Sequence, residues 1–160
     1  MAGKRAFSVG KIDELHQKIS EHRLLMLDTM VFSYHLSNHP RYAPLSATVL
    51  EAIESGETMG LTSTITIAEL LTVPAQSGLR RALQEYELYL THFPNLRIVT
   101  LDLALAREAA LVRADTRLRM PDAIQIAAAQ LANADGIVTN DKRWVGRITQ
   151  PTIVLLDDYA

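Results

Sequence analysis

Cysteine is absent from the 160 residues of this chain. That absence excludes disulfide bonds, thiolate metal sites and cysteine nucleophiles together, and it fits a reducing compartment. No apolar run approaches the roughly 20 residues that a membrane-spanning helix needs. The first residues, MAGKRAFSVG, are basic, but no apolar stretch of signal-peptide type follows them. We therefore expect an intracellular, cytoplasmic protein with no membrane partner.

A general excess of positive charge is also missing. The chain has 16 lysine and arginine residues against 18 acidic ones, a formal net charge of -2, which argues against a protein that coats nucleic acid through charge alone. Positive charge is instead concentrated late in the chain, in Arg107, Arg113, Arg117, Arg119, Lys142, Arg143 and Arg147. Such a cluster is typical either of a solvated helix face or of a surface that follows phosphates.

The residues that are present suffice for one folded domain, since 48% are hydrophobic and 21% are charged. Short apolar segments with β-branched residues alternate with helical patterns. The expected strands are 24–28, 58–63, 96–101, 136–140 and 152–156, and the expected helices between them are 31–36, 45–54, 66–71, 79–90, 103–115 and one beginning at Pro121. This alternation predicts an α/β protein with a mainly parallel sheet of about five strands, covered on both faces.

The first 22 residues are interpreted as an extension of this α/β unit. Ile12, Leu15 and Ile19 have helical spacing within KIDELHQKI, which predicts one short amphipathic helix. The expected organisation is a helical extension over residues 1–22 and one domain over residues 23–160. We expect no role for the extension beyond solubility or packing.

Four acidic residues fall where the predicted fold would bring them together. Ligands of open parallel sheets bind beyond the carboxyl ends of the strands. Asp28 ends the first predicted strand, Glu69 lies in the helix entered from the second, and Asp141 follows the fourth. Asp122 reaches the same edge if the helices on either side of DTRLRM form a hairpin, because the proline before it suits the first position of a helix.

Each acid also has an ordinary interpretation. In the first helical turn Asp122 complements the helix dipole, which is worth about 0.3–1 kcal/mol. Asp28 and Asp141 fit turn or cap positions, and an exposed helix position fits Glu69. Together the acids favour a site, because Asp28 and Glu69 interrupt apolar segments in which an unpaired carboxylate would cost several kcal/mol. Four converging acids repel one another, and a divalent cation relieves that repulsion.

The residue types indicate which cation and which chemistry. Carboxylates and water suit Mg²⁺ or Mn²⁺, whereas zinc sites generally use histidine or cysteine. His35 and His39 have the spacing of paired ligands, but Pro40 ends that helix at once and no HExxH pattern accompanies them. Without a glycine-rich phosphate loop or an evident Ser-His-Asp arrangement, the residues favour metal-assisted hydrolysis of a phosphodiester, with the basic cluster following the phosphates.

These segments resemble the PIN-domain ribonucleases, and within them the VapC type, the toxins of bacterial and archaeal toxin-antitoxin pairs. The resemblance covers about residues 24–157 and rests on LLMLDT, TSTITIAELL, RMPDAIQIAAA and IVTNDKRW, in that order. It implies a three-layer α/β/α sandwich and an endoribonuclease that depends on Mg²⁺ or Mn²⁺. The catalytic residues and metal ligands that it implies are Asp28, Glu69, Asp122 and Asp141.

The resemblance also implies roles for neighbouring residues and for partners. The small polar residues that accompany the acids are Thr29, Ser63, Thr139 and Asn140, and the candidates for RNA binding are Arg117, Arg119, Lys142 and Arg143. VapC-like proteins usually form homodimers and are neutralised by a cognate, VapB-like antitoxin that lies across the active-site groove. Tyr86, Tyr89 and Phe93 are candidates for either surface, although aromatic residues at that spacing are more often core. Met30 departs from the family, which often has a polar residue after DT.

Two other interpretations stay open at this point. A PIN-like module that binds RNA or protein without cutting would keep the fold, and the loss of a site acid would be its simplest sign, but all four are present. A phosphorylatable receiver domain is also a parallel α/β fold with acids at strand ends. It would have a pair of acids after the first strand, where Asp28 stands alone. We therefore prefer an active ribonuclease, whose target RNA and number of metal ions are open.

Overall fold

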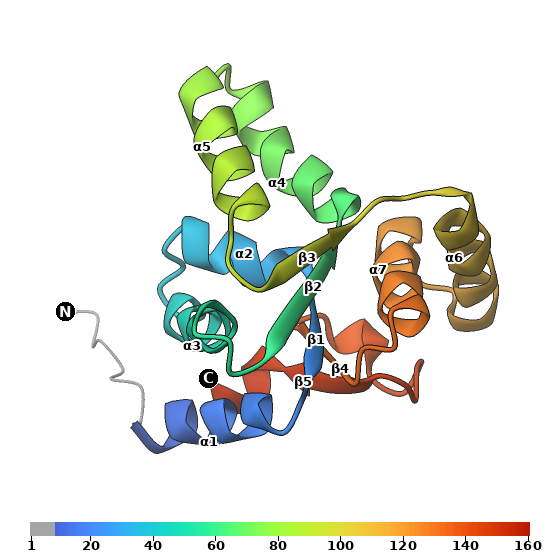
Figure 1. Ribbon diagram of the computed structural model, residues 1–160, viewed down its shortest axis with the longest axis horizontal. Helices are drawn as coiled ribbons and strands as arrows, with labels where there is room; N and C mark the ends of the chain where they lie inside the picture. Colours follow the sequence, from blue (N-terminus) through green and yellow to red (C-terminus); the bar gives the residue numbers. More distant parts are fainter. Residues whose placement is uncertain (1–8) are drawn as a thin grey trace.

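The computed structural model describes residues 9–160, in which five parallel strands form one sheet in the order β3-β2-β1-β4-β5 (Figure 1). The strands are β1 (Leu24–Leu27), β2 (Met59–Ser63), β3 (Leu96–Val99), β4 (Gly136–Thr139) and β5 (Thr152–Leu155). The helices are α1 (Val9–Ser20), α2 (Thr29–Leu36), α3 (Ala43–Glu54), α4 (Thr64–Gln76), α5 (Arg80–Thr91), α6 (Leu103–Thr116) and α7 (Met120–Leu131), with short 3-10 helices η1 (Lys142–Trp144) and η2 (Leu156–Tyr159). The predicted α/β class and parallel sheet are confirmed.

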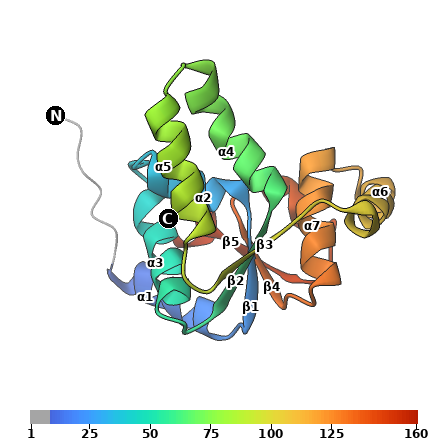
Figure 2. The ribbon, with the colours of Figure 1, turned by 45° about the horizontal axis from the view of Figure 1, so that its top comes forward.

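Both faces of the sheet are buried, which explains why the central strand β1, LLML, is a continuous apolar run. Successive side chains of a strand point to opposite faces. In β1, Leu25 and Leu27 join a core with α1, α2 and α3, whereas Met26 joins a core with α6 and α7. Figures 1 and 2 show the sheet between these two helical layers. The predicted three-layer sandwich is therefore confirmed.

The α4–α5 hairpin extends away from the sheet in both views. Ser63 begins it, since this last residue of β2 caps α4 and its hydroxyl accepts a hydrogen bond from the backbone N–H of Ile65. The hairpin exposes more than half of three large apolar side chains, Val73, Leu79 and Leu88. The first turn of α4 therefore lies at the edge of the sheet, and the far end of the hairpin is exposed to solvent.

The α6–α7 hairpin is the connection on which the predicted position of Asp122 depends. Arg117 makes its turn possible by adopting a left-handed conformation, with φ of 59°. Arg113 Nη1 donates to the carbonyl of Leu118 at 3.2 Å, and Arg147 Nη1 donates to the carbonyl of Thr116 at 2.6 Å. No strand lies between the two helices, so the hairpin prediction is confirmed.

The helix α1 packs into the domain instead of standing apart from it. Leu15 and Ile19 are fully buried in the core that includes α3. After α1, the His22 carbonyl accepts a hydrogen bond from the Thr58 hydroxyl at 2.7 Å. A Cβ added at Gly136 would meet the His22 ring at 2.5 Å, so the small residue permits this contact. The predicted amphipathic helix is confirmed with a packing role, residues 1–8 lie outside the described part, and the domain boundary at residue 22 stays a prediction.

Several element boundaries differ from the predicted ones. The helix α2 begins at Thr29, not at residue 31, because Asp28 caps it. The helix α4 continues to Gln76, beyond the predicted residue 71, with Pro74 inside it. The 3-10 helices η1 and η2 were not predicted. Over residues 9–160, no helix has both the length and the apolar content to cross a membrane.

Candidate functional site

Asp28 is held where β1 passes into α2. Its Oδ1 accepts a hydrogen bond from the backbone N–H of Thr29 at 2.8 Å, and its Oδ2 accepts one from the Thr139 hydroxyl at 2.8 Å. The residue is only 6% exposed. Burial raises the pKa of Asp28 to about 7; the two hydrogen bonds lower it, and the negative charges of Asp122 and Glu69 raise it further. Asp28 is thus a buried carboxyl group that other acids approach.

Thr139, at the end of β4, links two of the predicted site acids. Its hydroxyl donates to Asp28 and accepts a hydrogen bond from the backbone N–H of Asp141 at 3.1 Å. Asn140 has a different role, because its amide accepts a hydrogen bond from a backbone N–H of η2 and donates to the Tyr34 hydroxyl at 3.2 Å. Of these two predicted residues, Thr139 contacts the acids and Asn140 joins β4 to η2 and α2.

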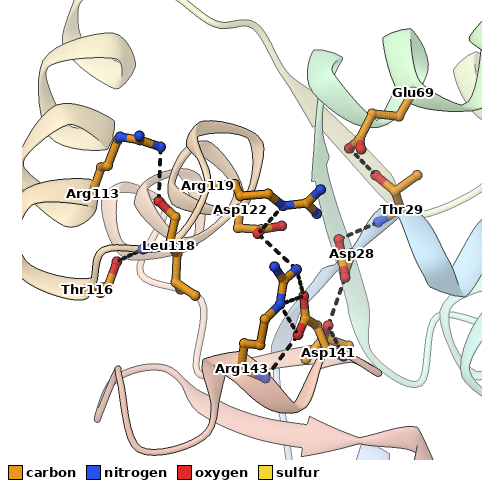
Figure 3. Close-up of polar contacts among 11 residues, drawn as sticks. Asp28, Thr29, Glu69, Arg113, Thr116, Leu118, Arg119, Asp122, Asp141 and Arg143 are labelled. Carbon is orange, nitrogen blue, oxygen red and sulfur yellow. Dashed lines mark hydrogen bonds and ion pairs between the residues drawn. The ribbon is translucent and has the colours of Figure 1, made fainter.

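Asp122 and Asp141 are paired with arginines. Arg119 Nε donates to Asp122 Oδ2 at 3.3 Å, and Arg143 Nη2 lies 3.6 Å from the same oxygen. Arg143 Nε donates to both carboxylate oxygens of Asp141, at 2.9 and 3.0 Å, and its Nη2 makes a further contact there. Figure 3 shows the Arg143 guanidinium between the two acids.

The pKa values of Asp122 and Asp141 are shifted in opposite directions. The hydrogen bond and charge of Arg143 hold the pKa of Asp141 below its ordinary value. Burial raises the pKa of Asp122, which is 7% exposed, against the attraction of Arg119. The charge of Asp141 also raises the pKa of Asp122. The acids are therefore close enough to influence one another.

Glu69 is exposed on α4, so the expectation that it interrupts an apolar environment is wrong. Neighbours in a helical sequence point to different faces, and the apolar residues around Glu69 in TITIAELL do not surround its side chain. The Thr29 hydroxyl donates to Glu69 Oε1 at 2.8 Å, which orients the carboxylate (Figure 3). The Thr66 hydroxyl oxygen lies 3.2 Å from that of Thr29, so the two threonines are also in hydrogen-bond contact.

Gln125, Ser63, Thr62 and Thr66 form a buried polar network that the sequence did not predict. Gln125 Nε2 donates to the Thr66 hydroxyl at 2.6 Å, while Gln125 Oε1 accepts from the Ser63 hydroxyl at 2.8 Å. Thr62 also donates to Thr66, at 2.8 Å. The network ties α7 to β2 and α4, and thereby fixes Asp122, one helical turn before Gln125, relative to α4. An amide within the apolar segment AIQIAAA was the available signal.

The candidates for RNA binding do not all contact the acids. Arg119 and Arg143 do, whereas Lys142 pairs with Asp157 at 2.7 Å, and Arg117 is exposed at the α6–α7 turn. His35 lies in the last turn of α2, which ends at Leu36, and His39 lies beyond it. The two histidines therefore do not have the helical arrangement of paired ligands.

One pocket lies away from these residues. It has a volume of about 390 Å³, lies between α2, α3 and α5, and none of the four acids lines it. Phe93 is buried there beneath Tyr89, with ring centroids 5.4 Å apart, as expected of core aromatic residues. The chemistry of the carboxylates, not the hollow, therefore marks the candidate site.

The donor set fits a hard divalent cation. Over residues 9–160, no three acidic or histidine side chains are arranged as ligands around one point, and Asp122 and Asp141 turn oxygens toward Arg143. All four donors are nevertheless carboxylates, the type that Mg²⁺ and Mn²⁺ prefer. Burial and neighbouring negative charge raise the pKa of Asp28, and a cation would relieve that cost.

The chain is thus a parallel α/β/α sandwich with acids near one edge of its sheet, an architecture that several families share. Residues 25–148 match the sequence model of the PIN domain. That match spans most of the chain, and the chain belongs to the PIN domain family. The receiver-domain interpretation is therefore not retained.

Solved structures agree with this family assignment. The chain is similar to a toxin-antitoxin complex from Klebsiella pneumoniae, with 21% identity, a TM-score of 0.62 and coverage of 82% of this chain and 97% of the other. It is similar to VapBC2 from Rickettsia felis bound to a promoter DNA fragment, with 19% identity, a TM-score of 0.65 and coverage of 82% and 98%. For FitAcB from Neisseria gonorrhoeae the values are 21%, 0.59, 82% and 97%. No curated protein matches the sequence. At these identities the similarity establishes the fold.

Proposed function

We propose that the protein is a metal-dependent endoribonuclease that hydrolyses RNA phosphodiester bonds and is the toxin of a toxin-antitoxin pair. The observation that supports this proposal most directly is that Asp28, Glu69, Asp122 and Asp141 lie near one edge of a PIN-domain sheet. There the charges of some of these acids raise the pKa values of others. The likeness to solved toxin-antitoxin structures supports the biological context.

In this proposal the four acids hold Mg²⁺ or Mn²⁺, which when bound supplies a water of lowered pKa and offsets charge on the phosphate. The protein directs the ligands. Thr139 and the backbone of Thr29 fix both oxygens of Asp28, and the Thr29 hydroxyl orients Glu69. Carboxylates whose orientation is already fixed bind a cation with less loss of side-chain freedom than mobile ones.

The RNA backbone would follow the basic residues beside the acids. Arg117, at the α6–α7 turn, and Lys142, in η1, are exposed, and Arg119 and Arg143 contact the acids. Charged donors of this kind bind phosphate oxygens and position the strand without reading its sequence. We assign the RNA contacts to these four residues.

The proposed protein partner is a cognate, VapB-like antitoxin. Its support is the similarity to solved structures of a toxin-antitoxin complex, of VapBC2 and of FitAB. A homodimer and a cytoplasmic location are part of the same proposal, and both stay predictions. Exposed apolar residues of the α4–α5 hairpin are available to such contacts.

The test is cleavage of a structured RNA mixture with Mn²⁺, Mg²⁺ or EDTA. Asp122→Asn keeps the shape of its side chain and removes its charge, so we expect a folded protein with no cleavage. Asp13→Asn, at an exposed position of α1, is the matched control and should cut like the wild type. Normal cutting by Asp122→Asn, or undiminished wild-type cutting in EDTA, would contradict the proposal. If folded, antitoxin-free protein cuts in no lane, the chain is instead a PIN module that binds without cutting.

A further inference from the structure

Arg143 contacts two of the proposed metal ligands at once. Its guanidinium binds both oxygens of Asp141 and approaches Asp122 Oδ2 to 3.6 Å. Its backbone N–H also donates to Asp141 Oδ1 at 2.9 Å. Arg119, by comparison, has a single contact, with Asp122 at 3.3 Å. Arg143 therefore places its positive charge where these acids would bind a cation.

We infer that Arg143 is a built-in counter-cation of the acidic site, which a divalent cation must displace and which then binds a phosphate oxygen of the RNA. The inference rests on the proposed function and assigns Arg143 a role beyond a general RNA contact. A guanidinium held between Asp122 and Asp141 and a divalent cation bound there would carry like charge at the same place, so the two compete.

The acids are more buried than the arginine that pairs with them. The side chain of Arg143 is 52% exposed, against 9% for Asp122 and 14% for Asp141. Asp122 is held by the first turn of α7, and the backbone of Asp141 by Thr139. Exchange of the cation therefore requires only a rotation of the Arg143 side chain toward solvent, where the substrate arrives.

The guanidinium suits both of its proposed positions. Its planar fork of N–H donors matches a carboxylate and a phosphate equally well. While it lies between Asp122 and Asp141, it reduces their repulsion. Once a doubly charged ion takes those oxygens, the strongest nearby acceptor for the guanidinium is the phosphate. Arg143 thus connects metal loading with substrate binding.

The first experiment measures Mn²⁺ binding by calorimetry without RNA, in the wild type, Arg143→Gln and Arg143→Lys. Removing a competing cation should tighten Mn²⁺ binding, and we expect about a fivefold to tenfold lower Kd for Arg143→Gln, with Arg143→Lys between. Arg80→Gln, at the tip of the α4–α5 hairpin, is the matched control and should bind like the wild type (Figure 1). Unchanged or weaker Mn²⁺ binding by Arg143→Gln would overturn the counter-cation role.

The second experiment measures cleavage at saturating Mn²⁺, where metal affinity no longer matters. Loss of a charged phosphate ligand should lower kcat/KM of Arg143→Gln by about tenfold or more, with partial recovery in Arg143→Lys. Tighter metal binding combined with slower cleavage is the diagnostic pattern, because a merely structural arginine would weaken both when removed. Wild-type cleavage by Arg143→Gln at saturating metal would overturn the phosphate role.

The two levels of failure are distinguishable. If the wild type and Arg80→Gln neither bind Mn²⁺ nor cut RNA, the proposed function itself fails. If both proteins bind Mn²⁺ and cut, and Arg143→Gln matches them in both measurements, the inference about Arg143 alone fails.

Discussion

Asp28 and Asp141 follow neighbouring strands and share the Thr139 hydroxyl, yet their surroundings move their pKa values in opposite directions. Burial raises the pKa of Asp28 to about 7, and its hydrogen-bond donors are a neutral hydroxyl and a backbone N–H. Asp141 is more exposed, and Arg143 lowers its pKa. One edge of the sheet therefore has a half whose acids have only neutral hydrogen-bond donors, called the neutral half, and an ion-paired half.

The difference shows how the site is prepared for a cation. In the neutral half, hydroxyl and amide groups fix the geometry of Asp28 and Glu69 but supply no positive charge. In the ion-paired half, Arg119 and Arg143 supply charge that can leave when a stronger cation arrives. The protein thus orients one pair of acids and reversibly neutralises the other.

The largest predicted effect comes from removing the charge of Asp28. A pKa of about 7, against the ordinary 3.8, corresponds to roughly 4 kcal/mol at most when the group is ionised. In EDTA at pH 8 we expect Asp28→Asn to raise the free energy of unfolding by about 2–4 kcal/mol while abolishing cleavage. Asp141→Asn should instead change it by about 0–1 kcal/mol in the destabilising direction, because its partner is half exposed. Urea unfolding checks both variants.

The raised pKa of Asp28 also predicts how the free energy of unfolding changes with pH. The folded state holds this proton more tightly than the unfolded state, so its stabilising contribution is complete below the ordinary pKa of 3.8 and is lost as pH rises through about 7. The wild type in EDTA should therefore lose about 2–3 kcal/mol between pH 5 and pH 8, relative to Asp28→Asn. Parallel pH profiles for the two proteins would break the proposed contrast between the halves.

The next effect tests what orients the neutral half. Gln125→Leu leaves the buried Ser63 and Thr66 without their amide partner, which should cost about 1–3 kcal/mol in the free energy of unfolding. It should also slow cleavage, because α7 loses its tie to α4. Gln130→Leu is the control on the same helix, since Gln130 is exposed and donates only to the Gln150 carbonyl. Equal losses for both variants would show that the buried network has no special part in positioning.

The positions of the acids could be predicted because local rules determine them. Asp28 and Asp141 follow apolar strands, and parallel strands end at one edge. Asp122 follows a proline at a helix start, and the chain before it has no strand, which requires a helical hairpin. These features depend on short segments of sequence, and the structure agrees with them.

The surroundings of the acids could not be predicted in the same way. The exposure of Glu69 depends on how α4 leaves the sheet, and apolar neighbours along the sequence do not reveal which helix face it occupies. The reach of Arg143 depends on η1, a single turn with no periodic pattern. The partners of Gln125 lie about 60 residues earlier in the chain. Each of these features arises from tertiary packing.

The smallest predicted effect concerns RNA binding beside the ion-paired half. Arg117→Gln removes one exposed charge at the α6–α7 turn, so the affinity for RNA should fall about threefold and the slope of log affinity against log salt should decrease by about 0.7–1, whatever the RNA sequence. Arg97→Gln removes an exposed charge from the edge strand β3, which β2 separates from β1 and β4, and should leave both quantities unchanged. Filter binding in EDTA over a range of salt concentrations measures both variants without cleavage. If the two substitutions weaken binding equally, the RNA does not follow the basic residues of the ion-paired half, and positive charge anywhere on the surface would explain the affinity.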